Sequence, residues 1–356
     1  NKSYWMTSME KKVVDKVKAK EIPFGKKRAT SYDVARLAGV SQSAVSRCFK
    51  PGASISSATR RKIEKIAKAV NYQPNAIARG LISGRSNIVA VIITDLTNIN
   101  YPQVLSELNR KFDEHNIHVL LFTLAKEGDV DKVLHKVWQY QVDGIVAAAQ
   151  FTDTQIIDCD ARGIPLVFYN RLYPETTVSS VCCDHREGER TLVEGLLATG
   201  NSSFVVMSGP EDSAVSVART KSAVGRLKGS ASNLVEVDGD YSYDTSCNLT
   251  RQIMDSGDFK PDAFVCTNDI MAIGCIDTLR KEYNVDVPND IAVVGFDGVE
   301  AAFWLNYDLT TVVQPLKRMV QATVTMVLER IEDPELPSEK RMFAGEIRHG
   351  SSAFLD

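Results

Sequence analysis

Apolar residues recur at helical spacing in the first part of the chain and form short, strand-like runs in the rest. The first predicted helix begins at Thr30, which can cap it because Asp33 follows three residues later. Val34 and Leu37 share one apolar face of this helix. Gly39 then supplies a permissive turn residue, so the helix is expected to end there.

A second short helix follows, with Ser41 as its cap and Val45 and Phe49 as its inward positions. Its outer positions carry Gln42, Ser43, Ser46 and Arg47. Such side chains suit base edges and phosphates, and base contacts concentrate at the N-terminal end of a recognition helix. Two helices around a glycine turn therefore predict a DNA-reading head.

A third helix is predicted from about Ser57. Its apolar positions are Ile63, Ile66, Ala67 and Val70, and most of the others are Lys or Arg. Three helices can close a small core. Residues 71–81 then read as a proline-set turn and a helix of barely two turns, which is too short to be stable alone.

From residue 87 onward, short apolar strands alternate with longer amphipathic segments. Eight strands are expected at 88–94, 119–123, 144–148, 166–169, 204–207, 234–237, 263–266 and 291–296. This alternation means parallel sheets covered by helices, and eight strands favour two doubly wound sheets over one. Neither GxGxxG nor GxxxxGK[ST] occurs, so no nucleotide cofactor is expected.

In open α/β sheets ligands bind off the carboxyl ends of the strands, so the residues that follow each strand are candidates for a site. They are Asp95, Asn98, Tyr101, Asn170, Arg171, Arg219, Asn268, Asp269 and Asp297. Amides, carboxylates, guanidinium groups and an aromatic ring suit a hydroxyl-rich small molecule. Any one of these residues could instead cap a helix or lie on the surface. For Asp95, Asn98 and Asp269 that interpretation has the same weight as a role in the site. The argument for a binding site therefore rests on several such residues following neighbouring strands.

Charge is divided unequally along the chain. Residues 1–82 carry 18 Lys and Arg against 5 Asp and Glu, about +13, and the remaining 24 against 40 give about −16, which makes the net charge of −3. A basic module would neutralise phosphates, and its log affinity for DNA would fall by ~0.9 per phosphate per log unit of salt. A merely solvated basic face is the alternative, but its coincidence with the helix pattern favours DNA.

Composition indicates a soluble globular protein. The 356 residues are 44% hydrophobic, and no stretch approaches the ~18 apolar residues of a membrane span. The N-terminal residues contain no apolar run of the signal-peptide kind, so a cytoplasmic location is expected. The seven cysteines lack CxxC spacing and are expected to be reduced and buried. His115 and His118 lack further ligands at suitable spacing, so no metal site is expected.

These motifs together resemble the lactose-repressor (LacI/GalR) family of bacterial transcriptional regulators. In the head the resemblance rests on Tyr32-Asp-Val-Ala, Ala38-Gly-Val-Ser, Val45-Ser-Arg47, Asn71-Tyr-x-Pro-Asn75 and Leu81. In the rest it rests on Leu196-Leu-Ala-Thr-Gly, Ser208-Gly-Pro, Arg219, Cys266-Thr-Asn-Asp269, Val293-Val-Gly-Phe-Asp297 and Leu309-Thr-Thr-Val-Val-Gln314. The resemblance covers almost the whole chain.

The resemblance implies a small all-α helix-turn-helix head and a hinge helix, followed by an α/β periplasmic-binding-protein-like core of two subdomains. Its limits would be an N-terminal extension at 1–27, the head at 28–73, the hinge and linker at 74–86 and the core at 87–356. Within the core, the N-subdomain would take about 87–183 and 316–337, and the C-subdomain about 184–314 and 338–356. The function implied is that of a repressor, not an enzyme, which binds a palindromic operator as a homodimer under the control of a small-molecule effector.

Roles for single residues are also implied by the resemblance. Bases would be read by Gln42, Ser43 and Arg47. Phosphates or the groove would be met by Tyr32, Ser41, Ser46, Lys50, Asn75, Arg79 and Leu81. The effector would be bound between the subdomains by Tyr101, Asn170, Arg171, Arg219, Tyr241, Asn268, Asp297 and Gln314.

Two of these roles have a distinct chemical basis. Arg47 is the best guanine reader of the set, because its fork matches O6 and N7. Leu81 would be an apolar wedge in the minor groove that kinks the duplex. Alternatively, Leu81 only anchors the linker on the first subdomain.

Some positions depart from the family pattern. Ala44 replaces a common threonine and Lys50 an asparagine, so the operator sequence cannot be carried over from a relative. Ser222 and Ala223 stand where a glycine and an aromatic residue are usual, which could change the packing around Arg219. Asn170 replaces an aspartate common in sugar-binding relatives, which makes a sugar acid an option beside a neutral sugar.

Two other classes of protein share part of this pattern. A transported-solute binding protein has the two-lobed core, but it would carry a secretory signal and no basic head. An enzyme would need an activated nucleophile or a cofactor loop. Cys183, Asp184 and His185 are adjacent in the sequence, but adjacency is not a catalytic geometry.

Overall fold

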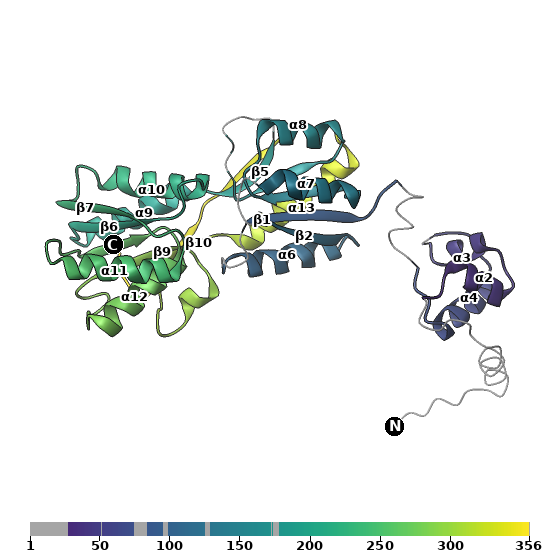
Figure 1. Cartoon of the computed structure of the whole chain (residues 1–356), viewed down its shortest axis with the longest axis horizontal. Coiled ribbons are helices and arrows are strands. Elements are labelled where there is room, and N and C mark those ends of the chain that lie inside the picture. The colour runs from purple at the N-terminus through teal and green to yellow at the C-terminus, as the bar shows by residue number, and fades with distance from the viewer. Residues whose placement is uncertain are drawn as a thin grey trace, which may run out of the picture. The chain divides into compact units, whose positions relative to one another are not determined.

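The computed structural model describes residues 28–50, 52–74, 84–94, 99–124, 129–171, 173 and 178–355. The chain divides into two compact units, Asn1–Ser86 and Asn87–Asp356. The described part of the first unit is helical, and the second unit contains two sheets, each with helices on its faces (Figure 1).

The first unit is the predicted three-helix head. Its helices are α2 (Ser31–Ala38), α3 (Gln42–Cys48) and α4 (Ser57–Ala69). Thr30 and Asp33 form the expected capping box, and Gly39 ends α2 in the left-handed conformation at φ 62°. Val34, Val45 and Ile63, one from each helix, meet in the core. The apolar spacing in the sequence therefore gave the correct inward faces.

The second unit contains two six-stranded sheets. The first sheet has the order β11-β5-β4-β3-β1-β2. Its strands are β1 (Ile88–Thr94), β2 (His118–Leu124), β3 (Gly144–Ala148), β4 (Leu166–Tyr169), β5 (Ser179–Cys183) and β11 (Lys340–Phe343). The second has the order β12-β10-β9-β8-β6-β7. Its strands are β6 (Ser203–Ser208), β7 (Asn233–Asp238), β8 (Ala263–Cys266), β9 (Ala292–Asp297), β10 (Thr310–Val313) and β12 (Glu346–Arg348). All pairs are parallel except β10 with β12.

Helices cover both faces of each sheet because successive strand residues point to opposite sides. In β1, Val89 and Val91 face α6 (Tyr101–Asp113) and α13 (Leu316–Glu332), whereas Ala90 and Ile92 face α7 (Val130–Gln139) and α8 (Asp153–Ala161). The second sheet is covered in the same way, by one helix pair on each face (Figure 1). The pairs are α9 (His185–Ala198) with α10 (Ala214–Leu227), and α11 (Tyr243–Ser256) with α12 (Asp269–Glu282). We call each sheet with its helices a lobe.

All eight predicted strands are present, within one or two residues of the expected limits, and two doubly wound sheets are confirmed. Four further strands, β5, β10, β11 and β12, were not predicted. Each has five residues or fewer, and they include polar stretches such as Ser179-Ser180 and Lys340-Arg341, so their hydrophobic signal is weak.

One expected boundary needs correction. The expected C-subdomain includes all of residues 338–356, but β11 pairs with β5 in the first sheet. The chain therefore leaves α13 along the first lobe and crosses between Phe343 and Glu346, after which β12 pairs with β10. The other two crossings follow β5 and β10, since α9 packs on the second sheet and α13 on the first.

All seven cysteines are buried and free, as expected. Burial raises the pKa of Cys182 and of Cys183 to about 12. No helix in the described ranges is long and apolar enough to cross a membrane.

Candidate functional site

The exposed face of α3 is the first candidate site. Ser43, Ser46 and Arg47 are exposed, whereas Val45 and Cys48 are buried against the rest of the head. The Ser41 hydroxyl accepts a hydrogen bond from the amide of Ala44 (3.2 Å), which fixes the start of the helix. Side chains at the N-terminal end of α3 are thus held outward on a short, capped helix.

The other residues expected to contact DNA are distributed around this face. Tyr32 is 72% exposed and Lys50 is exposed, while Gln42 is half-buried and donates through Nε2 to the hydroxyl of Ser31 (3.3 Å). Ser41 lies 2.9 Å from the hydroxyl of Ser43. The three remaining residues lie outside the described ranges, and they are Asn75, Arg79 and Leu81.

A continuous chain of hydrogen bonds in the second unit joins five residues. The imidazole of His185 lies between Asn170, 2.9 Å from its Oδ1, and Arg219, whose Nε lies 3.2 Å from the His185 Nδ1. Arg219 donates through Nη2 to Oδ1 of Asp297 (2.8 Å), and Gln314 donates to the same oxygen (2.7 Å). Asn170 follows β4 of the first sheet, while Asp297 ends β9 and Gln314 follows β10 of the second. The chain of bonds therefore runs from one lobe to the other.

Arg219 is the centre of this chain and is only 2% exposed. Its Nη1 donates to the carbonyl oxygen of Thr267 (2.7 Å), and its guanidinium stacks 3.8 Å from the centre of the Phe296 ring. All three of its nitrogen atoms thus have protein partners. Burial, together with the cationic Arg219, holds the pKa of His185 well below its usual value, so this imidazole is neutral.

Asp269 holds the loop that carries Asp297. Its Oδ2 accepts from the amides of Gly298 (2.7 Å) and Val299 (2.9 Å), and its Oδ1 accepts from the hydroxyl of Thr311 (2.6 Å). Asp297 itself has a positive φ of 129°, which is rare for a residue other than glycine. Asp269, which the sequence left open between a cap and a site residue, therefore stabilises a strained turn beneath the site.

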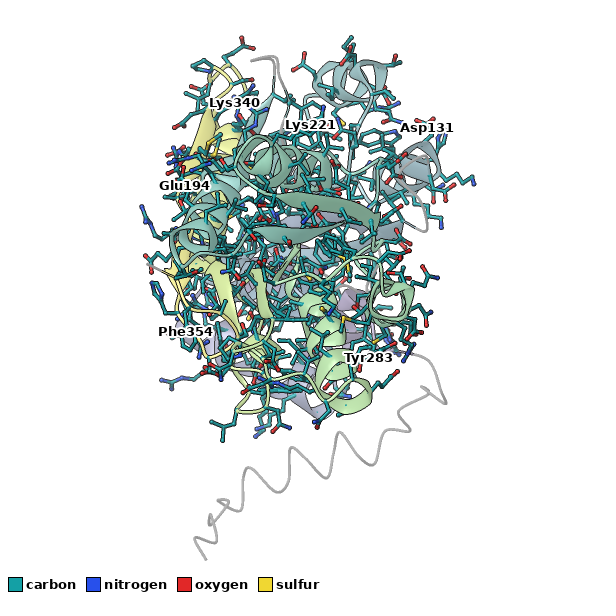
Figure 2. The ribbon with its side chains drawn as sticks, turned by 90° about the vertical axis from the view of Figure 1, so that its left-hand side faces the viewer. Asp131, Glu194, Lys221, Tyr283, Lys340 and Phe354 are labelled. Carbon is teal, nitrogen blue, oxygen red and sulfur yellow. The ribbon has the colours of Figure 1, made fainter. Side chains whose placement is uncertain are left out.

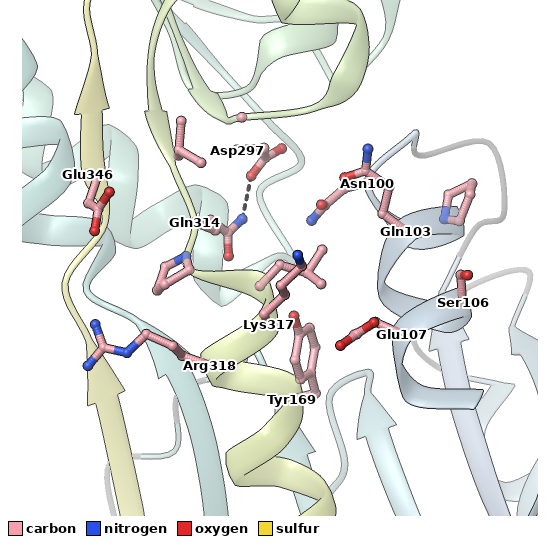
Figure 3. A pocket seen from close by; sticks show the side chains of 15 residues that line it. Asn100, Gln103, Ser106, Glu107, Tyr169, Asp297, Gln314, Lys317, Arg318 and Glu346 are labelled. Carbon is pink, nitrogen blue, oxygen red and sulfur yellow. Dashed lines mark hydrogen bonds between the residues drawn. The ribbon is translucent and has the colours of Figure 1, made fainter. Parts of the chain in front are cut away.

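A cleft of about 770 Å³ opens beside this chain of bonds. Asp297 and Gln314 lie on one side of it. They are faced by Gln103 on the first turn of α6 and by Asn100, the cap residue before that helix (Figure 3). Both hydrogen bonds to Asp297 use Oδ1, which leaves Oδ2 toward the cleft. The lining also includes an aromatic ring, two cations and two further carboxylates, which are Tyr169, Lys317, Arg318, Glu107 and Glu346.

The remaining residues expected at the effector site lie near the bond chain or apart from it. Arg171 is buried and donates to the carbonyl oxygen of Asn170 (3.0 Å), and the hydroxyl of Tyr241 is buried close enough to Arg219 and Asp297 for their charges to affect its pKa. Asn268 instead caps α12 through the amide of Met271 (3.0 Å). The hydroxyl of Tyr101 lies 3.2 Å from that of Thr94 and donates to the carbonyl oxygen of Ala148 (3.4 Å), all within the first lobe.

Sequence reasoning missed two buried residues at this site. In the sequence, His185 stands out only as a neighbour of Cys183. Glu189, one turn further along α9, is fully buried, and neither of its carboxylate oxygens has a hydrogen-bond partner among the described residues. Burial raises its pKa to about 8. A carboxylate at an inward helical position is a signal that could have identified it.

The cations of the cleft were missed too, because Lys317 and Arg318 follow a short strand that was not predicted.

Comparisons with known proteins match both units of the chain. The family described as bacterial regulatory proteins, lacI family, matches residues 30–75, and the periplasmic binding protein-like domain matches residues 196–353. The chain is 30% identical to the HTH-type transcriptional repressor PurR of Vibrio atlanticus (strain LGP32) over 325 residues, which are 88% of this chain and 95% of that protein. It is 29% identical to the ribose operon repressor of Escherichia coli (strain K12) over 330 residues, 88% of this chain and 96% of that protein.

Solved structures show the same similarity. A crystal structure of the lac repressor dimer bound to operator and the anti-inducer ONPF has a TM-score of 0.82 and 25% identity, and it covers 92% of this chain and 99% of that chain.

Proposed function

The chain belongs to the lacI family of bacterial regulatory proteins, and from this we propose that it represses transcription as a homodimer on a palindromic operator, under the control of a small metabolite. The observation that carries the proposal is the exposed face of α3 on a capped helix of a basic head. A two-fold dimer needs two half-sites, because one short helix gives little specific affinity alone. Residues 74–86, of which 75–83 lie outside the described ranges, would be the hinge and linker, and a repressor of transcription would act in the cytoplasm.

On the operator, Gln42, Ser43 and Arg47 would read bases. Backbone and groove contacts would come from Tyr32, Ser41, Ser46, Lys50, Asn75, Arg79 and Leu81. The hydroxyls of Ser41 and Ser43 lie 2.9 Å apart, and each can form a further hydrogen bond to DNA beside this contact. The exposed Arg47 remains the strongest candidate for a direct guanine contact.

Replacing Arg47 with alanine should weaken binding to the selected operator by about 1–3 kcal/mol and relax the choice of one base. Lys50→Ala is the matched control, because loss of a phosphate contact should weaken binding to all sequences alike and lower the salt slope by about 1. Competitive anisotropy titrations against single-base operator variants would measure both effects. An Arg47→Ala protein with unchanged sequence preference would contradict the proposed recognition helix.

The effector would bind in the cleft between the lobes. Asp297 and Gln314 offer acceptors for hydroxyl groups, while Tyr169 also lines the cleft but is only 3% exposed. Arg219 is already committed to Asp297, His185 and Thr267. If the effector is a sugar acid, its carboxylate would therefore meet Lys317 or Arg318 rather than Arg219. The deeper residues Asn170, Arg171 and Tyr241 would support this surface, with Tyr101 and Asn268 at its margins.

The experiment that tests the proposal is selection of a randomised duplex library on the full-length protein. The winning duplex would then be titrated by anisotropy against salt and against sugars, sugar acids and nucleobases. A palindrome with a steep salt slope would support the regulator, and the compound that shifts the curve would identify the effector and the sign of its action. Selection of no sequence, with and without cell extract, would argue against it.

An exposed apolar segment after β9 provides a surface for the dimer. Leu305 is 98% exposed and Trp304 is 58% exposed, next to the half-exposed Phe303 at the end of the 3-10 helix η2 (Glu300–Phe303). Large apolar side chains grouped in this way are typical of protein interfaces. A second copy of the chain is the partner that a palindrome requires.

Leu305→Glu is expected to shift the protein from dimer to monomer. Operator binding should then weaken, because the two DNA-reading heads are no longer held together. Ile157→Glu is the matched control, since Ile157 on α8 is 66% exposed and should tolerate the charge. Sedimentation velocity over a concentration series would measure the oligomeric state. A Leu305→Glu protein that stays dimeric would remove this segment from the interface.

We also propose that the chain is not an enzyme. The thiol of Cys183 is buried with a raised pKa, so it is a poor nucleophile. His185 cannot act as its base, because both ring nitrogens already bond to Arg219 and Asn170.

A further inference from the structure

His185 lies at a crossing between the lobes. It is the first residue of α9, directly after β5 and the cap residue Asp184, and it is 1% exposed. Its ring packs on Phe296 with 5.5 Å between ring centres. On one edge it meets Asn170 of the first lobe, and on the other it meets Arg219 of the second.

The chemistry of the partners fixes the proton of this imidazole. Arg219 Nε carries a hydrogen and can only donate, so the His185 Nδ1 must be the acceptor. A neutral imidazole with an unprotonated Nδ1 carries its proton on Nε2, which then donates to the Oδ1 of Asn170. That oxygen also accepts from the amide of Cys183 (3.5 Å), consistent with an acceptor facing the ring.

We propose that His185 is a positioning residue that ties the two lobes together, acting as a one-way hydrogen-bond relay from Arg219 to Asn170. Neutral imidazole suits this place because it accepts on one edge and donates on the other. Asn170 is fixed by the first lobe and Arg219 by the second, so the imidazole between them sets the distance between these two side chains. The idea rests on the proposed function in one respect, since the lobes it ties are those whose relative movement would carry the effector signal.

The relay also links the tie to the cleft. Arg219 is hydrogen-bonded to both His185 and Asp297, and Asp297 also accepts a hydrogen bond from Gln314. Asp297 and Gln314, which line the cleft, therefore belong to the same chain of hydrogen bonds as the contact between the lobes. A ligand that pulls on the Oδ2 of Asp297 therefore acts on a side chain whose position depends on His185. This gives a physical route from cleft occupancy to the separation of the lobes.

The test measures the distance between the lobes in the free, full-length protein. Spin labels would be attached at Thr154→Cys on α8 and Lys221→Cys on α10, two exposed positions on different lobes, while the native cysteines are buried (Figure 2 labels Lys221). His185→Leu removes both hydrogen bonds and is expected to shift and broaden the distance distribution. His185→Gln, whose amide can accept from Arg219 and donate to Asn170, is expected to restore it. His135→Leu, at an exposed position on α7, is the control.

A second measurement needs no substitution. The nitrogen-15 shifts of the wild-type imidazole should report an unprotonated Nδ1 and a protonated Nε2, unchanged over the pH range in which exposed histidines titrate. The opposite tautomer, or a distance distribution that His185→Leu leaves unchanged, would overturn the relay. So would a His185→Gln protein that behaves like His185→Leu. Neither measurement uses DNA or an effector, so failure to select an operator would count against the proposed function alone.

Discussion

Arg219→Met is expected to lower the free energy of unfolding by about 3–5 kcal/mol, because it leaves the buried carboxylate of Asp297 without its cation. Methionine keeps an unbranched side chain in this buried place, but the change also removes the guanidinium that stacks on the Phe296 ring. The same change also removes the donors to His185 and to the carbonyl of Thr267, which stay buried. A typical domain is stable by only about 5–15 kcal/mol, so this is a large fraction.

Urea unfolding, followed by fluorescence and circular dichroism, would measure the effect. Arg226→Met is the control on the same helix, because Arg226 pairs with Glu194 in an ion pair that is more than a third exposed on each side. Such a surface pair contributes at most about 1 kcal/mol. If the two variants lost equal stability, the buried ion pair of Arg219 with Asp297 would contribute no more than the surface pair of Arg226 with Glu194.

The architecture could be predicted because its signal is local. The three head helices follow from caps such as Thr30 and Ser41 and from apolar spacing within one or two turns. The longer central strands, such as β1 and β6, are continuous apolar runs because both of their faces are covered. The edge strands β11 and β12 lack this signal, since their residues are largely exposed or half-buried.

The site could be predicted only in part, because its bonds join residues far apart in the chain. The sequence indicated Arg219 and Asp297 as site residues, and the structure brings them within 2.8 Å of each other. The sequence could not indicate that every guanidinium nitrogen of Arg219 already has a protein partner, because the other two partners are His185 and the carbonyl of Thr267. The cleft beside them is instead lined by residues from the starts of α6 and α13, such as Gln103 and Lys317.

Glu189→Gln is expected to change how stability depends on pH. The pKa of Glu189 is raised from 4.5 to about 8, first because the side chain is buried and then because Asp297 and Asp269 are nearby, while Arg219 opposes the shift. Between these two values the folded protein keeps a proton that the unfolded chain has lost. Stability therefore falls as pH rises through this window, by up to about 1.4 kcal/mol per pH unit.

Glutamine has nearly the shape of the protonated acid but does not ionise. Below about pH 4.5 the free energy of unfolding should therefore depend on pH in the same way for the variant and the wild type. From there to about pH 8 the variant should become more stable relative to the wild type, by several kcal/mol in total, on the order set by the pKa shift. Urea unfolding at intervals from pH 5 to pH 9 would measure the difference. Glu194→Gln, on the surface of the same helix, is the control and should show no such gain. A constant difference between Glu189→Gln and wild type across this range would mean that Glu189 is already ionised in the folded protein, paired with Arg219 despite its burial.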